Sequence, residues 1–277
     1  MTFRSDPAPM RGRVDLPMQK LIHITAPHLV APRQTLYGLD PAARLGSVLA
    51  DVAATHSDAG AVLITGDLAD AGQPTAYETL HDLVDNFPIP VHLTLGNHDS
   101  RPGFQMVFGG DGFVHSSIDL GRWRVILVDT KDETSVHGSL DGDRLDWLDQ
   151  QLTAAANRPV LLAMHYPPHD LHVPNFAAFG LKDPKALHAL IARHGNVRQM
   201  LFGHMHLNVS GMLFGIPFSV NRGTAQHIAL DLGQRGKPAF VAGQPSFAIV
   251  LLDVDEAVVH HIDGLSNLPM LRPADPK

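Results

Sequence analysis

The 277-residue sequence contains no cysteine, and this absence removes several kinds of chemistry at once. Disulfides, thiolate metal ligands and cysteine nucleophiles are excluded, so any metal site must use nitrogen and oxygen ligands. Long hydrophobic runs are missing too, since none approaches the roughly 18 apolar residues expected of a membrane-spanning helix. We therefore expect a protein without a membrane partner.

Positive charge is also scarce. Lys and Arg number 21 against 28 Asp and Glu, which gives a formal net charge of −7. Proteins that bind nucleic-acid polymers usually carry a clustered excess of basic residues, so we do not expect that partner. A small phosphate substrate remains compatible with this composition, because bound cations can supply positive charge locally.

The sequence is nevertheless rich enough in apolar residues, at 44%, to build one large core. Residues 1–19 contain Pro and Arg but no apolar signal-peptide core, so we expect a flexible leader on a cytoplasmic protein. Residues 20–210 are predicted to form the core. Residues 211–277 are predicted to supply C-terminal strands and a lobe that complete the sandwich, with a possible contact for a homo-oligomer.

From residue 20 onward, short apolar runs alternate with segments of helical periodicity, a pattern typical of βα units around a buried sheet. Gly121-Arg122 predicts the turn of a hairpin, and residues 222–245 a loop or lobe excursion. Predicted strands lie at 21–25, 61–65, 91–95, 113–120, 123–128, 160–164, 198–202, 211–220, 246–252 and 258–262, and predicted helices at 40–52, 76–86, 141–156 and 184–193. The sequence therefore predicts an α/β sandwich with mixed sheets.

Polar side chains follow several of the predicted strands directly. They are Gly66-Asp67-x-x-Asp70, Gly96-Asn97-His98-Asp99, His165 and Gly203-His204-x-His206. Taken singly, such residues are most often turn formers, helix caps or buried histidines with satisfied hydrogen bonds. Together at strand ends they predict one site built from many loops, and their nitrogen and oxygen donors suit Mn, Fe, Co, Zn or Ni better than Ca or Mg.

In this order the motifs resemble the calcineurin-like metallophosphoesterase superfamily, over residues 20–210. More narrowly, they are similar to class III cyclic-nucleotide phosphodiesterases and bacterial glycerophosphodiesterases. The resemblance implies a four-layer αββα sandwich with mixed β-sheets and a small β-rich C-terminal lobe. It also implies two divalent metal ions (Mn, Fe, Zn or Co) and a metal-bound hydroxide that attacks phosphorus.

The resemblance also implies roles for particular residues. The alpha metal would be held by His28, Asp67 and His206, and the beta metal by Asp67, Asn97, His165 and His204. Asp67 would bridge the two ions, and His98 would act as a catalytic group beside the phosphate. Asp70 and Asp99 would orient their neighbours.

The sequence departs from this family where relatives carry Asp-x-His after the first strand. Here stands Ala26-Pro27-His28, and Ala26 has no donor atom. The alpha site is therefore expected to be weakened and the activity reduced, because a missing carboxylate removes both charge and geometry. A second departure is Tyr166, which follows His165 where relatives often carry another His.

The function that this resemblance implies is metal-dependent hydrolysis of small phosphodiesters, with cyclic nucleotides favoured. The alternatives are a phosphomonoesterase and a catalytically dead phosphate- or nucleotide-binding protein, which Ala26 keeps open. The candidate pocket residues are Tyr166, His169, Phe176 and Phe179. For the two Phe residues, closing the core beneath the loop is an equally good interpretation. For Tyr166 the simpler interpretation is packing, and for His169 it is a position in a solvent-exposed loop.

Overall fold

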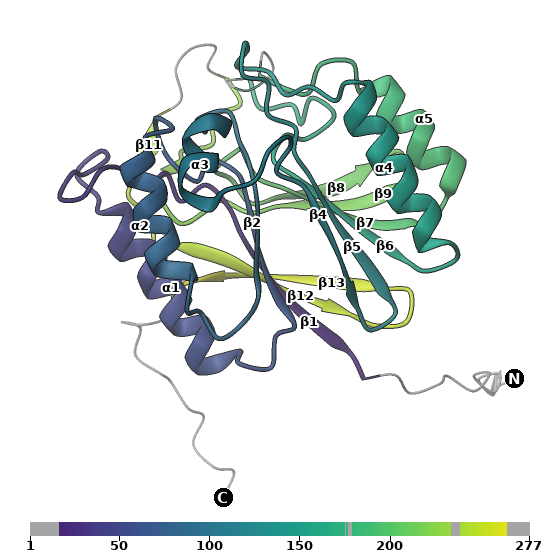
Figure 1. Ribbon diagram of the computed structural model, residues 1–277, viewed down its shortest axis with the longest axis horizontal. Coiled ribbons are helices and arrows are strands. Elements are labelled where there is room, and N and C mark those ends of the chain that lie inside the picture. The colour runs from purple at the N-terminus through teal and green to yellow at the C-terminus, as the bar shows by residue number, and fades with distance from the viewer. Residues whose placement is uncertain (1–16, 175, 177–178, 234–238, 265–277) are drawn as a thin grey trace, which may run out of the picture.

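The computed structural model describes residues 17–174, 176, 179–233 and 239–264, and most of the predicted leader therefore lies outside it. The described residues form two large β-sheets that face each other, with helices on both outer faces (Figure 1). The helices are α1 (Pro41–Thr55), α2 (Pro74–Val84), α3 (Arg101–Phe108), α4 (Gly142–Ala155) and α5 (Pro184–His194). The strands are β1 (Gln19–Ile24), β2 (Ala61–Thr65), β3 (Val91–Thr94), β4 (Ser116–Leu120), β5 (Trp123–Val128), β6 (Val160–Met164), β7 (Val197–Phe202), β8 (Val209–Leu213), β9 (Ile216–Val220), β10 (His227–Ile228), β11 (Phe240–Val241), β12 (Ser246–Leu252) and β13 (Ala257–Asp263).

The first sheet has the order β13-β12-β1-β2-β3, in which β1, β2 and β3 are parallel and the other two pairings are antiparallel. Helices α1, α2 and α3 cover its outer face (Figure 1). Helix α1 begins as predicted, because the Asp40 carboxylate accepts the Ala43 N–H at 3.0 Å and Pro41 suits the first helical turn. Its buried stripe includes Leu45, Val48 and Val52.

The second sheet has the order β4-β5-β6-β7-β9-β8, parallel from β5 to β9 and antiparallel at both edges. Helices α4 and α5 pack on its outer face through residues such as Leu148 and Leu187. A third apolar layer, with Leu63 and Trp123 among its members, fills the space between the sheets. These layers confirm the predicted four-layer αββα sandwich with mixed sheets.

The C-terminal strands join both sheets. β8 and β9 extend the second sheet, β12 and β13 extend the first, and β10 and β11 form a separate two-stranded sheet within the segment predicted as a loop excursion. The predicted hairpin is β4 and β5, although β4 begins at Ser116 rather than 113. Helix α3 was not predicted; Ser100 starts it by accepting the Gly103 N–H through its Oγ.

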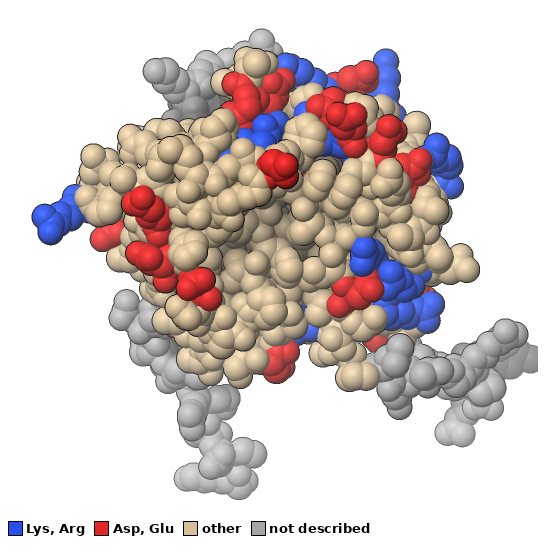
Figure 2. Space-filling model, in the orientation of Figure 1, with Lys and Arg blue, Asp and Glu red and all other residues tan. Residues whose placement is uncertain are grey.

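On the face of the described residues shown in Figure 2, Lys and Arg lie in separate groups beside Asp and Glu. Among the ion pairs, Arg124 and Arg158 each bind Asp119 at 2.9 Å. Among the described residues, no helix combines the length and the apolar character required to cross a membrane.

Candidate metal centre

The loops that follow the parallel strands bring the predicted ligands together. His28 follows β1, Asp67 follows β2, Asn97 follows β3, His165 follows β6, and His204 and His206 follow β7. Because β1–β3 and β6–β7 end at corresponding edges of the two sheets, these loops meet across the sandwich. Except for His165, which is fully buried, the predicted ligands line one cavity of about 230 Å³.

One group of donors, which we call the His28 cluster, consists of His28, Asp67 and His206, with ligand atoms within 4.8 Å of one another. Nδ1 of His28 lies 3.0 Å from an Asp70 carboxylate oxygen, and Nδ1 of His206 donates to the Gln226 carbonyl at 2.7 Å. Each ring thus keeps Nε2 for a ligand, and the two Nε2 atoms are only 3.1 Å apart. Two neutral imidazoles that face each other in this way repel unless a cation or proton lies between them, so the donors fit a divalent ion.

The second group, the His165 cluster, consists of Asp67, Asn97, His165 and His204. His165 donates from Nδ1 to the Thr65 carbonyl at 2.9 Å, which turns its Nε2 to within 3.1 Å of Asn97 Oδ1 and 3.3 Å of Asp67 Oδ2. His204 Nδ1 lies 2.9 Å from the same Asn97 oxygen. Asp67 belongs to both clusters, so the donor set fits two ions that share one carboxylate.

Electrostatics favour the ligating forms of Asp67, His204 and His206. Burial would raise the pKa of Asp67, but the imidazoles of His165 and His98 hold it well below its usual range. Burial, with a neighbouring imidazole in each case, lowers the pKa of His204 and of His206 to about 3. A carboxylate and neutral imidazoles are the protonation states that bind metal.

The backbone at the site is conformationally unusual. Positive φ angles occur at Ala26 (49°), His28 (45°), Asp67 (51°), His204 (70°) and His206 (51°). Non-glycine residues adopt this region rarely, and such strain clusters at active sites and ligand clamps. The concentration of left-handed residues around the two clusters therefore supports a functional site there.

Asp99 and Asp70 hold the ligand loops in place. The Asp99 carboxylate accepts the N–H groups of Leu68 (3.0 Å), Ala69 (2.9 Å) and Gly96 (2.8 Å) and the Tyr77 hydroxyl (3.0 Å). These bonds tie the Asp67 loop to the Asn97 loop. Burial and the Asp67 carboxylate raise the pKa of Asp99 to about 6.

His98 lies beside the His28 cluster, and its ring is 41% exposed. Its backbone N–H donates to Asp67 at 2.9 Å, and its ring Nδ1 donates to the Asp70 carbonyl at 2.8 Å. Among the described residues, Nε2 has no hydrogen-bond partner. Burial acts to lower the pKa of His98, but the Asp67 carboxylate and the bond to Asp70 together raise it. The net result is a raised pKa for His98 beside the predicted ligands.

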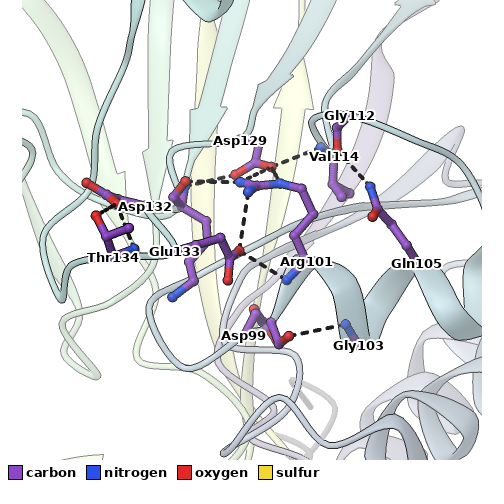
Figure 3. Close-up of polar contacts among 12 residues, drawn as sticks. Asp99, Arg101, Gly103, Gln105, Gly112, Val114, Asp129, Asp132, Glu133 and Thr134 are labelled. Atoms are coloured by element: carbon purple, nitrogen blue, oxygen red, sulfur yellow. Dashed lines mark hydrogen bonds and ion pairs between the residues drawn. The ribbon is translucent and has the colours of Figure 1, made fainter.

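A further supporting network, which the sequence analysis missed, lies behind Asn97. The Arg101 guanidinium binds Asp129 through Nε (3.1 Å) and Nη2 (3.0 Å) and also binds Glu133 (Figure 3). The same guanidinium donates to the Lys131 carbonyl. The Lys131 ammonium then donates to the Asn97 carbonyl at 3.0 Å. One signal was available, because Asp129 follows an apolar strand directly, as Asp67 does.

The predicted pocket residues lie in different places. Phe176 and Phe179 line the 230 Å³ cavity and also an adjoining cavity of about 330 Å³. His169 lines only the adjoining cavity. Tyr166 is fully buried outside both cavities, and its hydroxyl donates to the Val136 carbonyl at 2.7 Å. Its ring packs against His204, so Tyr166 does not line the predicted substrate pocket.

Two exposed aromatic residues that the sequence analysis did not single out complete the cavity. Tyr37 and Phe240 keep 63% and 39% of their surfaces exposed, and their rings stack with centroids 4.7 Å apart. Both line the cavity that donors of the two clusters also line. Tyr37 comes from the loop between β1 and α1 and Phe240 from β11, so the pairing depends on tertiary structure.

An αββα sandwich whose strand ends carry two His/Asp clusters joined by one carboxylate defines a candidate binuclear metallohydrolase centre. The family model described as calcineurin-like phosphoesterase matches residues 20–208. The chain belongs to this family, and the resemblance noted in the sequence is confirmed. Membership implies a centre of two divalent metal ions.

Individual relatives agree with this assignment. A probable cyclic nucleotide phosphodiesterase of Rhodopseudomonas palustris is 34% identical over 91% of this chain and 94% of that protein. A cAMP/cGMP dual specificity phosphodiesterase of Mycobacterium tuberculosis is 32% identical over 78% and 72%, respectively. A dimetal phosphatase from Danio rerio, at 16% identity, matches with a TM-score of 0.62 over 87% of this chain and 98% of that one, a likeness in fold.

Proposed function

We propose that this protein is a metal-dependent phosphodiesterase that hydrolyses small phosphodiesters, with cyclic nucleotides as the preferred class. The observation that carries the proposal is the pair of donor clusters sharing Asp67 at the base of a cavity rimmed by exposed aromatic rings. The names of the relatives support the same substrate class. His28, Asp67 and His206 would hold one ion, and Asp67, Asn97, His165 and His204 the other.

When bound, two divalent ions of the Mn, Fe, Zn or Co type supply Lewis acidity to phosphoryl oxygens and lower the pKa of water. The protein residues orient the reaction. His98 lines the cavity, its Nε2 has no partner among the residues that the structure describes, and the raised pKa of its ring suits donation of a proton to the leaving oxygen. Asp70 fixes that ring through its carbonyl and the His28 ring through its carboxylate.

The rim of the cavity favours a substrate with a planar group. Tyr37, Phe240 and Phe179 are large, partly exposed and close to the clusters. Exposed aromatic surface of this kind stacks with nucleobases, at about 1–3 kcal/mol per base. A cyclic nucleotide would place its phosphate at the clusters and its base on these rings.

Ala26 favours one second candidate, a binding protein that recognises a phosphate ligand without hydrolysing it. Ala26 is fully buried and has no donor atom, and the His28 cluster consequently presents three donors. In our proposal the missing donor reduces both the affinity for one ion and the rate of hydrolysis, without abolishing either. Added metal then restores the weakened position by mass action.

The experiment that tests the function compares hydrolysis of a phosphodiester with that of the corresponding monoester, by protein stripped of metal and reloaded with Mn²⁺. We expect faster hydrolysis of the diester and a further gain in Ala26→Asp. Preference for the monoester would favour a phosphomonoesterase. Nucleotide binding without turnover in either form would favour the binding protein.

A further inference from the structure

A segment that returns to the site after β9 packs directly on Ala26. The Thr224 N–H donates to the Thr25 carbonyl at 3.2 Å, and the Ala225 N–H donates to the Ala26 carbonyl at 3.3 Å. Arg44 of α1 fixes this segment from the other side, because its guanidinium donates to the carbonyls of Thr224 (2.7 Å) and Ala225 (2.9 Å). The residue that follows Ala225 is therefore held close to the position of the missing donor.

That residue is Gln226, and it lies between Ala26 and His206. Its carbonyl accepts the His206 Nδ1–H at 2.7 Å, while its neighbour Ala225 is bonded to Ala26. Gln226 is 3% exposed and lines the same cavity as His28 and Asp67. Gln226 is thus a buried residue whose backbone contacts His206 and which shares a cavity with the His28 cluster.

The side-chain oxygen of Gln226 needs a partner. Oε1 is buried and makes no hydrogen bond to the described residues. A buried acceptor left unsatisfied costs about 1–3 kcal/mol. Amide oxygens are ligands for divalent ions, and an ion in the neighbouring cluster would satisfy this oxygen.

We propose that the Gln226 amide oxygen completes the His28 cluster by binding its divalent ion, in place of the carboxylate that Ala26 lacks. The inference rests on the metal centre of the proposed function. A neutral oxygen replaces an anionic one, so the ion is held less tightly than by a carboxylate but more tightly than by His28, Asp67 and His206 alone. Asp67 remains the carboxylate that the two ions share, and the centre carries more positive charge toward an anionic substrate.

Metal binding tests this directly and needs no substrate. Metal-free protein is titrated with Mn²⁺ by isothermal calorimetry, and bound metal is counted by mass spectrometry. We expect Gln226→Leu, which keeps the size but removes the oxygen, to weaken the weaker of the two sites by at least tenfold, within the about 10–100-fold typical of groups around a metal. The matched control is Gln199→Leu in β7, which removes another buried amide (4% exposed) outside the cavity and should leave both affinities unchanged.

Two more variants separate ligation from general damage. Gln226→Glu should bind the weaker ion more tightly than the parent, which a misfolded site would not do. In an Ala26→Asp background, the added carboxylate should hold the same ion, so a further Gln226→Leu substitution should change its affinity little. Unchanged metal affinity in Gln226→Leu would overturn the proposal, as would unchanged affinity in Gln226→Glu if the Leu variant does not fold. The partner of Oε1 would then be an ordered water or a substrate hydroxyl. Failure of the proposed function would instead appear as intact metal binding without diester hydrolysis.

Discussion

The two donor clusters lie side by side but are built differently. The His165 cluster presents four side-chain donors, and the backbone of Asn97 is bonded to Lys131 behind it. The His28 cluster presents three, with the buried methyl group of Ala26 beside them. In our proposal the first cluster has a side-chain donor at every expected position and the second lacks one, although Asp67 belongs to both.

This difference separates what the fold provides from what a single side chain provides. Ala26 keeps the left-handed backbone of the site (φ 49°), a conformation that Asp and Asn adopt more readily than Ala. In our proposal the loop has a shape suited to a ligand although Ala26 supplies no ligand atom. The affinity of the His28 cluster for its ion then depends on the surrounding segments.

The largest effect should come from the residue that the two clusters share. We expect Asp67→Asn to lower kcat/KM by on the order of 10³-fold, about 4 kcal/mol at 1.36 kcal/mol per tenfold, because both ions lose their common anionic ligand. Metal content should fall at both sites. Steady-state kinetics and metal analysis check this. Retention of two tightly bound ions would contradict the prediction, because it would show that the clusters do not depend on Asp67.

A carboxylate added to each cluster should have unequal effects. We expect Ala26→Asp to lower the Mn²⁺ concentration for half-maximal activity by roughly 10–100-fold, the range seen when groups around a metal change. Asn97→Asp adds a negative charge to the cluster that already has four donors, so its effect should be smaller. Activity measured across a Mn²⁺ series distinguishes the two, and equal shifts would mean that the clusters are equivalent.

The sequence predicted the donors that follow strands better than the residues that come from other segments. Asp67 and His165 could be assigned because each follows a buried apolar strand, and strand ends converge wherever the sheet forms. Tyr37 could not, because it comes from a segment without periodicity and its position depends on stacking against Phe240 of β11. Helix α3 escaped prediction because an eight-residue helix carries too few apolar repeats to be recognised.

A smaller effect is expected at the cavity rim. Tyr37→Ala should raise KM for a cyclic nucleotide by about tenfold, since base stacking contributes roughly 1–3 kcal/mol. The kcat for the same substrate should change little because Tyr37 is not a metal donor. A small diester without an aromatic group serves as the control, and an equal rise in its KM would contradict a stacking role.

The smallest effect concerns stability rather than the site. Burial and the nearby His261 lower the pKa of His23 to about 3, so the folded protein excludes a proton that the unfolded chain binds below its ordinary pKa of 6.5. Stability therefore falls as pH drops from about 6.5 toward 3, by at most about 1.4 kcal/mol per pH unit from this residue. His23→Gln should flatten this slope in urea unfolding measured at pH 7, 6 and 5.

The metal affinities of the same variant serve as the control. His23 bonds Thr65, two residues before Asp67, at 2.8 Å but belongs to neither cluster. Both Mn²⁺ affinities at pH 7 should therefore stay within about twofold, or 0.4 kcal/mol, of the parent. A change confined to one cluster would mean that its weakness originates in the strands beneath it rather than in Ala26.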